Sequence, residues 1–169
     1  MDINRHRTAC FTGYKPEQFT FPLNDKNSTE YQHLKKRINE AVTETLRMGF
    51  NTFICGMDKG FDLLCAKAVI DIRRKSRYRY IELIAAIPFN RHGFSGEWGR
   101  MHRLVKHHAS HEIIIAPNKH TRSCYHLRNC FMVNNSSYLI CCWDGQRGGT
   151  AHTVRMAEES GHMLRNITF

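Results

Sequence analysis

The sequence predicts an α/β fold: a three-layer sandwich in which a mostly parallel sheet of about six strands lies between helices. Three observations support this prediction. Short apolar runs alternate with amphipathic segments along the whole chain, in strand–helix order. Glycine or proline follows several of the apolar runs, as is typical where strands end. With 169 residues, 41% of them hydrophobic, the chain can form one domain with its own core, expected to span residues 1–169.

The first strand and the first helix are marked by the residues at their ends. Residues 8–12 form an apolar run that stops at Gly13, which predicts a strand. Residues 30–48 carry apolar side chains at helical spacing, with Ser28 before them as a capping residue and Gly49 after them as a stop. A strand followed by a long helix is therefore expected at the start of the chain.

The middle of the chain repeats this pattern. Residues 51–55 predict a second strand, and the turn after them leads into a helix with apolar side chains between residues 63 and 72. Residues 80–87 are apolar enough for a strand that is buried on both faces, and Pro88 ends it. A basic helix is expected over residues 97–108.

The last third supplies the remaining elements. We expect strands at residues 112–116, 138–143 and 163–167, and helices at residues 122–134 and 150–160. The strict alternation favours right-handed crossovers, which place helices on both faces of a parallel sheet.

The net charge of +10 favours acidic partners such as phosphates, nucleotides or nucleic acid. Much of the positive charge lies in two runs, residues 73–79 and residues 100–111. A solvated face is the simpler interpretation of each run. Few aromatic residues are interleaved with them, whereas single-strand binders need such residues. We expect a small-molecule nucleotide or nucleotide sugar as the partner, with nucleic acid as an alternative and a homo-oligomer as a further option.

Cysteine usage and hydropathy predict the compartment. The seven cysteines are odd in number and form no C-x-x-C pair, which indicates a reducing, cytoplasmic environment rather than a disulfide scaffold. No apolar stretch reaches the length of a secretory signal or a transmembrane helix, so no membrane association is expected.

Histidines are dense between residues 102 and 111, and the side chains of His107 and His111 would share a helix face and could bind a metal. No Cys, Asp or Glu completes a metal shell at a familiar spacing, so we expect no metal site and no required cofactor. The patterns G-x-S-x-G and G-x-x-x-x-G-K-[ST] are absent from the sequence.

Three loops that follow strands are expected to meet at one edge of the sheet, because ligands of open α/β sheets bind beyond the carboxyl ends of the strands. They are residues 12–16, 56–62 and 144–150. The last of them reads DGQRGGT, and its free N–H groups at a helix start favour phosphate binding. The alternative is a plain turn in which Thr150 only caps the helix. Likewise, Asp62 either contacts a ribose or only complements a helix dipole.

The helix at residues 122–134 carries Arg128, whose guanidinium suits a phosphate or a departing anionic group. We expect Leu127, Phe131 and Met132 to face the core, which leaves the arginine free to point toward the strand ends. The alternative is an ordinary surface arginine.

Five segments resemble one known family. Residues 10–16 (CFTGYKP), 55–62 (CGMDKGFD) and 86–89 (AIPF, followed by Trp98) are similar to its motifs, as are residues 124–133 and 144–150. On these segments the chain resembles the YpsA-like branch of the SLOG superfamily. That branch contains compact Rossmann-like proteins related to the LOG phosphoribohydrolases and to the DNA-processing protein DprA.

The resemblance implies a pocket for a nucleotide or nucleotide sugar at the strand ends. Tyr14 and Lys15 stand where the family has His and Arg, and Thr153 stands where the LOG relatives have a glutamate. Because that carboxylate is missing, binding or sensing is favoured. Hydrolysis of a nucleotide N-glycosidic bond is the first alternative, and nucleic-acid binding, as in DprA, is the second. The hydrolase would use Arg128, Asp62 or Asp144 as catalytic residues. The candidate ligand-binding residues are Thr12, Gly13, Lys15, Gly56, Met57, Gly60, Asp62, Arg128, Asn129, Asp144, Gly145, Gly148, Gly149 and Thr150.

Overall fold

The computed structural model describes residues 2–118 and 121–168 and shows one sheet of six parallel strands with five α-helices. This confirms the predicted α/β fold. The strands are β1 (Thr8–Gly13), β2 (Thr52–Cys55), β3 (Glu82–Ile87), β4 (His111–Ile114), β5 (Tyr138–Cys142) and β6 (Met163–Asn166). The helices are α1 (Thr29–Arg47), α2 (Phe61–Arg73), α3 (Gly96–His108), α4 (Arg122–Asn134) and α5 (Gly149–Glu159), and the short 3-10 turns are η1 (Arg5–Arg7), η2 (Pro16–Gln18) and η3 (Ser76–Tyr78).

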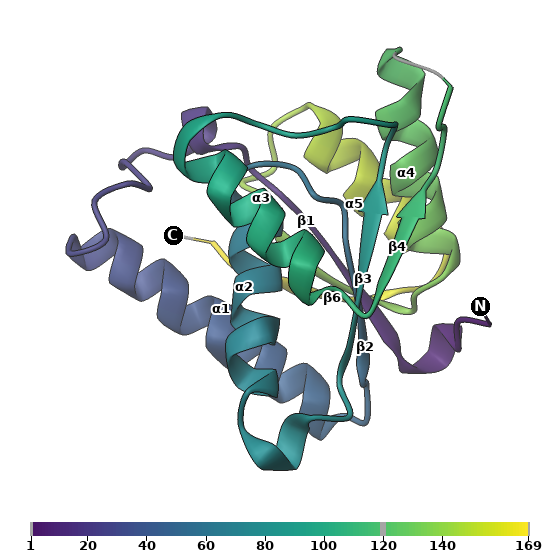
Figure 1. The fold of residues 1–169 in the computed structure, drawn as a ribbon, viewed down its shortest axis with the longest axis horizontal. Coiled ribbons are helices and arrows are strands. Elements are labelled where there is room, and N and C mark those ends of the chain that lie inside the picture. The colour runs from purple at the N-terminus through teal and green to yellow at the C-terminus, as the bar shows by residue number, and fades with distance from the viewer. Residues whose placement is uncertain (1, 119–120, 169) are drawn as a thin grey trace.

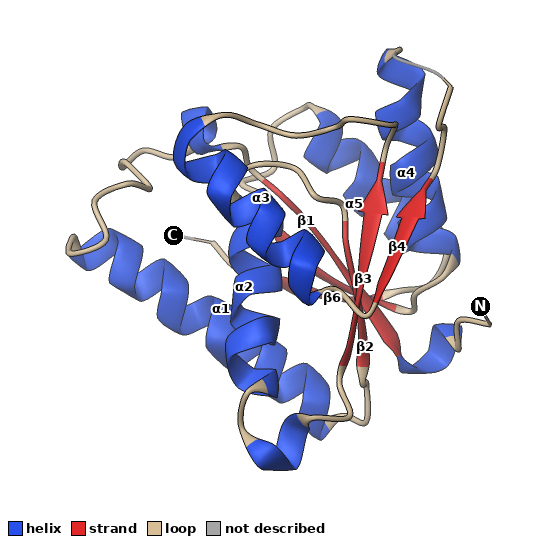
Figure 2. Cartoon of the chain, in the orientation of Figure 1, coloured by secondary structure: helices blue, strands red, loops and turns tan. Residues whose placement is uncertain are grey.

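The helices form two layers, one on each face of the sheet (Figures 1 and 2). Helix α2 packs between α1 and α3 on one face, and α4 packs against α5 on the other. Side chains alternate between the faces along each strand. In β2, for example, Phe53 and Cys55 belong to the core under α1, α2 and α3, whereas Ile54 belongs to the core under α4 and α5. Each face therefore has its own core, as a three-layer sandwich requires.

The strand order is β4-β3-β2-β1-β5-β6. From β1 the chain adds β2, β3 and β4 on one side and then returns to add β5 and β6 on the other. The order of strands reverses between β1 and β5, which pair directly, with Gly13 opposite Cys142. In open α/β sheets such a reversal leaves a crevice beyond the carboxyl ends of the two strands, and ligands bind there.

Local contacts set the ends of the helices. Ser28 Oγ accepts a hydrogen bond from the Tyr31 N–H (3.2 Å) and caps α1, as predicted. Gly60, the N-cap of α2, has φ +94°, and a Cβ atom there would lie 2.5 Å from the Tyr14 carbonyl oxygen. The Phe61 N–H donates to that same oxygen at 3.0 Å. Close approach of backbone to backbone, which only glycine permits, thus joins the start of α2 to the loop after β1.

Some predicted boundaries and one predicted contact differ from the structure. The third strand begins at Glu82, where pairing with β2 begins, and Tyr80 is exposed. The prediction that Leu127 faces the core is wrong, because its side chain is 42% exposed. The buried residues of α4 are Cys124, Arg128, Met132 and Val133, so a polar side chain occupies the position expected for an apolar one.

All seven cysteines are free thiols, and six of them are buried. In residues 2–118 and 121–168, no helix combines the length and the apolar character needed to cross a bilayer.

Candidate functional site

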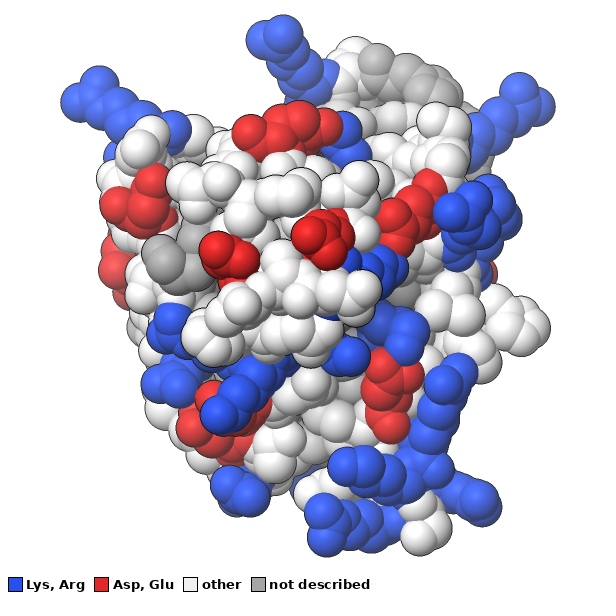
Figure 3. Space-filling view, turned by 90° about the vertical axis from the view of Figure 1, so that its left-hand side faces the viewer, with Lys and Arg blue, Asp and Glu red and all other residues white. Residues whose placement is uncertain are grey.

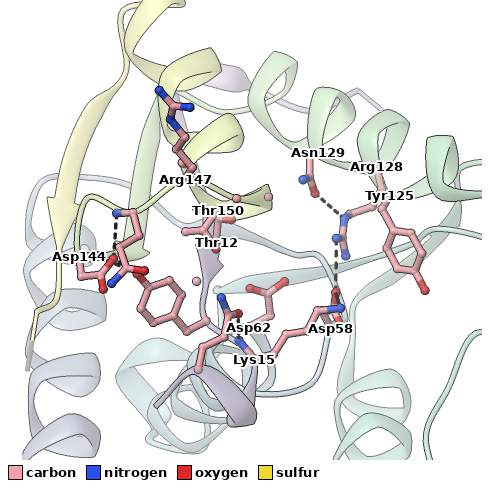
Figure 4. A pocket seen from close by; sticks show the side chains of 17 residues that line it. Thr12, Lys15, Asp58, Asp62, Tyr125, Arg128, Asn129, Asp144, Arg147 and Thr150 are labelled. Atoms are coloured by element: carbon pink, nitrogen blue, oxygen red, sulfur yellow. Dashed lines mark hydrogen bonds and ion pairs between the residues drawn. The ribbon is translucent and has the colours of Figure 1, made fainter. Parts of the chain in front are cut away.

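A cavity of about 380 Å³ opens at the carboxyl ends of β1 and β5, at the reversal of strand order. Four segments form its walls: the loop after β1, the loop after β2 with the start of α2, one side of α4, and the loop after β5 with the start of α5 (Figure 4). Its lining residues are Thr12, Gly13, Tyr14, Lys15, Gln18, Asp58, Asp62, Tyr125, Arg128, Asn129, Asp144, Gln146, Arg147, Gly148, Gly149, Thr150 and Ala151. We call this cavity the crevice pocket.

The amino end of α5 lines one side of the crevice pocket. Gly148 is its N-cap, with φ 155° and ψ −169°, and Gly149, Thr150 and Ala151 form the first turn. The N–H groups of a first helical turn have no partner within the helix, and they carry the positive end of the helix dipole. A Cβ atom at Gly148 or Gly149 would meet nothing within 4 Å, so the backbone here is open to the cavity. Arg147 precedes this turn and adds a positive charge.

Arg128 lies on the opposite wall and is 5% exposed, so the interpretation as a surface arginine is wrong. Its guanidinium donates to the Gly56 carbonyl oxygen, lies 3.9 Å from the Asp58 carboxylate, and donates from Nε to Asn129 Oδ1 at 2.7 Å. Asn129 in turn donates to Thr153 Oγ1 (2.8 Å). Helix α4 and the loop after β2 thus hold the cation in one position.

Two aspartates and a lysine complete this wall. Burial raises the pKa of Asp62 to about 7, against the attraction of Arg128, which lowers it, while the nearby Asp58 raises it. Asp58 also lies 3.5 Å from Lys15 Nζ. At neutral pH the Asp62 carboxyl is therefore divided between its protonated and ionised forms, and it can donate or accept a hydrogen bond.

Tyr14 and Asp144 connect the two loops that flank the crevice. The Tyr14 hydroxyl donates to the Asp144 carboxylate, and the Asp144 N–H donates to the Tyr14 oxygen at 3.1 Å. The Gln146 N–H donates to the same carboxylate at 3.0 Å. These hydrogen bonds, the Tyr14 bond first, lower the pKa of Asp144, so its carboxylate is ionised at neutral pH. Tyr14, which stands where the family has a histidine, thus joins the loop after β1 to the loop after β5.

The family model described as the YspA SLOG family matches residues 9–167. The chain belongs to this SLOG family. Among solved structures it is similar to the DNA processing protein A (DprA) from Streptococcus pneumoniae, with a TM-score of 0.62 and 15% sequence identity. That match covers 95% of this chain and 50% of that one, so this chain spans half the length of DprA, and the likeness shows the fold. A search of curated proteins found no match.

In this SLOG chain, ten of the fourteen candidate residues line the crevice pocket. They are Thr12, Gly13, Lys15, Asp62, Arg128, Asn129, Asp144, Gly148, Gly149 and Thr150. Gly56, Met57, Gly60 and Gly145 are not among its lining residues. Whether the lining residues bind a ligand stays a prediction.

Three of the four candidates outside the lining have packing roles in this SLOG chain. A Cβ atom at Gly56 would lie 2.7 Å from both Arg128 Nη1 and Asp62 Oδ2, so this glycine makes room for the charged wall. Met57 is fully buried in the core, and Gly60 approaches the Tyr14 backbone. These contacts give Gly56 and Gly60 a packing role, and a contact of either glycine with a ligand stays a prediction.

Sequence reasoning missed seven lining residues, namely Tyr14, Gln18, Asp58, Tyr125, Gln146, Arg147 and Ala151. Most of them are sequence neighbours of residues that were found. Tyr125 lies three and four positions before Arg128 and Asn129 on α4, and residues at this spacing share a helix face. That spacing was the signal that could have revealed it.

The histidines between residues 102 and 111 lie in two different elements. His107 lies in the last turn of α3, whereas His111 is the first residue of β4. The expectation that the two share a helix face is therefore wrong. Within the described part of the chain, no group of three His, Cys, Asp or Glu side chains is placed to hold an ion.

Proposed function

We propose that the crevice pocket binds a nucleotide or a nucleotide sugar, with a phosphate group at the amino end of α5. The observation that carries this proposal is the open first turn of α5 at Gly148, Gly149 and Thr150, which faces the crevice between β1 and β5. Backbone N–H groups at a helix start bind phosphate through hydrogen bonds and through the helix dipole. Membership of a SLOG family supports a nucleotide-related ligand.

The opposite wall fits the rest of such a ligand. Asp62 and Asp58 can accept hydrogen bonds from ribose hydroxyls, as acidic residues do in dinucleotide sites. The ring of Tyr125 offers a flat surface to a base, and Lys15 and Arg128 lie 5.8 Å from its centroid. The cavity volume of about 380 Å³ lies in the range of small-ligand sites. Binding in this mode uses only groups of the chain itself.

Isothermal titration with paired probes tests the proposal. We expect AMP, ADP and ADP-ribose to bind, and adenosine, which lacks phosphate, to bind at least about tenfold more weakly, because charge-assisted hydrogen bonds at the helix start are lost. Guanine and pyrimidine counterparts in the panel report the choice of base. If a folded sample binds no member of the panel, or binds adenosine as well as AMP, the phosphate site is not where we place it.

Hydrolysis of a nucleotide N-glycosidic bond is the second candidate function, and the buried Asp62 beside Arg128 favours it. In its protonated form Asp62 can donate a proton to the departing base while water attacks the sugar carbon and then releases its surplus proton to solvent. Arg128 can neutralise the phosphate of the phosphoribosyl group. Thr153 takes the place of the glutamate of the LOG relatives and is hydrogen-bonded to Asn129 and to the Gly149 carbonyl oxygen. Asp144 is ionised, which makes it a poor acid.

Chromatography of nucleoside monophosphates decides this second candidate. Release of free base by the wild type, lost in Asp62→Asn and in Arg128→Ala, would support it. If the wild type releases no base although titration shows that it binds the nucleotide, the pocket binds without hydrolysis.

A further inference from the structure

The two basic runs, residues 73–79 and 100–111, meet at the amino ends of β3 and β4. The crevice pocket lies at the other end of the strands. Arg73 at the end of α2 donates to the carbonyl oxygen of His108 and, at 3.1 Å, to Ser110 Oγ in the turn between α3 and β4. A shallow groove of about 580 Å³ lies at this junction. Its lining combines the end of α2, the start of β3 and this turn: Ile70, Arg73, Arg74, Arg79, Tyr80, Ile81, Glu82, His108 and Ser110.

Positive charge dominates this surface. Residues 71–82 hold five Lys or Arg and two acidic residues. Arg74 lies 3.5 Å from Asp71, whereas Lys75, Arg77 and Arg79 are exposed in the segment after α2. Figure 3 shows Lys and Arg side chains gathered at the lower end of the molecule, the end at which α2 stops in Figure 1. We call this surface, residues 73–80 with the adjoining groove, the basic groove.

Two aromatic rings, those of Tyr78 and Tyr80, lie among these cations. Tyr80 is 55% exposed, and its ring centroid lies 6.5 Å from that of Tyr78. The Arg77 guanidinium lies 4.7 Å from the centroid of the Tyr78 ring. The sequence Arg77-Tyr78-Arg79-Tyr80 thus presents cations and rings side by side on an exposed segment.

Helix electrostatics accounts for only part of this cluster. Cations are favoured at the last turn of a helix because the carbonyl end of the dipole is negative, which accounts for Arg73 and Arg74 at the end of α2. It does not account for Arg77 and Arg79, which lie beyond the helix, or for an exposed tyrosine ring among them. Tyr80 thus presents an exposed ring beside cations for which the helix dipole does not account.

We infer that the basic groove binds single-stranded nucleic acid. Lys75, Arg77 and Arg79 would contact successive phosphates, and an unpaired base would stack on Tyr80. A duplex offers the same phosphates, but its bases are stacked on each other and leave the ring without a partner. The site is separate from the crevice pocket, because the groove lies at the amino ends of β3 and β4 and the pocket at the carboxyl ends of β1 and β5.

Fluorescence anisotropy with a labelled oligothymidine of about 20 nucleotides, and with a duplex of the same length, tests this inference. We expect tighter binding of the single strand. With three phosphate contacts, log Kd should change with log salt concentration by a slope of about 2 between about 50 and 200 mM salt. The double variant Arg77→Ala/Arg79→Ala should weaken binding and reduce that slope by about 1.4. Tyr80→Ala should weaken binding by about tenfold and leave the slope unchanged.

A matched control removes the same charge elsewhere. Lys35→Ala/Lys36→Ala takes two exposed cations from α1, and binding should change less than about twofold, as for a loss of distant charge under screening. The inference fails if the wild type binds no oligonucleotide at low salt, if the duplex binds as tightly as the single strand, if Tyr80→Ala has no effect, or if the control weakens binding as much as the arginine variant. Titration of the same variants with AMP reports the crevice pocket independently.

Discussion

The proposed phosphate site can be tested by removing one N–H group from the backbone. Gly149 is the first residue of α5, and proline is well tolerated at this helix position because its missing N–H has no partner within the helix. The preceding Gly148 is extended, with φ 155° and ψ −169°, and so lies outside the α region that proline disfavours in the residue before it. Gly149→Pro should therefore keep the fold and delete a single donor. A hydrogen bond to a charged group contributes about 1.5–3 kcal/mol, so nucleotide affinity should fall by about 10- to 100-fold.

Gly149→Ala is the matched control for this variant. Alanine keeps the N–H, and its Cβ atom would meet nothing within 4 Å. We expect AMP to bind Gly149→Ala with nearly the wild-type Kd and Gly149→Pro much more weakly, as measured by isothermal titration, while thermal melting shows that both are folded. Equal affinities of the proline and alanine variants for AMP would refute the reasoning that the first turn of α5 holds the phosphate.

Three further predictions concern the wall of the crevice pocket. Burial raises the pKa of Asp62 from its ordinary range to about 7, so between about pH 4 and 7 the native state holds a proton that the unfolded state has lost. The free energy of unfolding should therefore be full at low pH and fall as pH rises through this window, and Asp62→Asn should lack the fall in urea titrations. Parallel pH profiles of the variant and the wild type would contradict this prediction. Gly56→Ala should cost about 1–3 kcal/mol of unfolding free energy through overpacking, whereas Gly93→Ala, where a Cβ atom meets nothing within 4 Å, should cost almost nothing; equal Tm values would contradict this contrast. Thr153→Val removes the acceptor of the Asn129 amide and should cost about 0.5–1.5 kcal/mol by denaturant unfolding, and an unchanged midpoint would exclude this role.

The fold could be predicted because its signals are local. Apolar runs of strand length, glycines at their ends and a capping serine each act within a few residues, and they place Ser28 and Gly49 correctly at the two ends of α1. Boundaries such as Glu82 in β3 depend on pairing with β2, which a single segment does not reveal.

The candidate site could be predicted less completely, because distant contacts decide what each residue does. A glycine before a helix looks the same in sequence whether it makes room for a ligand or for another part of the protein. Gly149 is open to the cavity, while the side chains of Arg128 and Asp62 occupy the space beside Gly56. The burial of that arginine likewise depends on a carbonyl oxygen that is 72 positions away in the chain. Leu127 was misplaced for the same reason, since the buried stripe of α4 follows the arginine.

The hydrogen bond between Tyr14 and Asp144 has a consequence for how the binding site could change. The backbone pairing of β1 and β5 ends at Gly13 and Cys142. Beyond it, the hydrogen bond from the Tyr14 phenol to the Asp144 carboxylate joins the two loops at the pocket entrance. The width of the pocket entrance thus depends on the Tyr14 side chain, while the register of the two strands does not. A substitution of Tyr14 could therefore admit a larger ligand without any change in the pairing of β1 and β5.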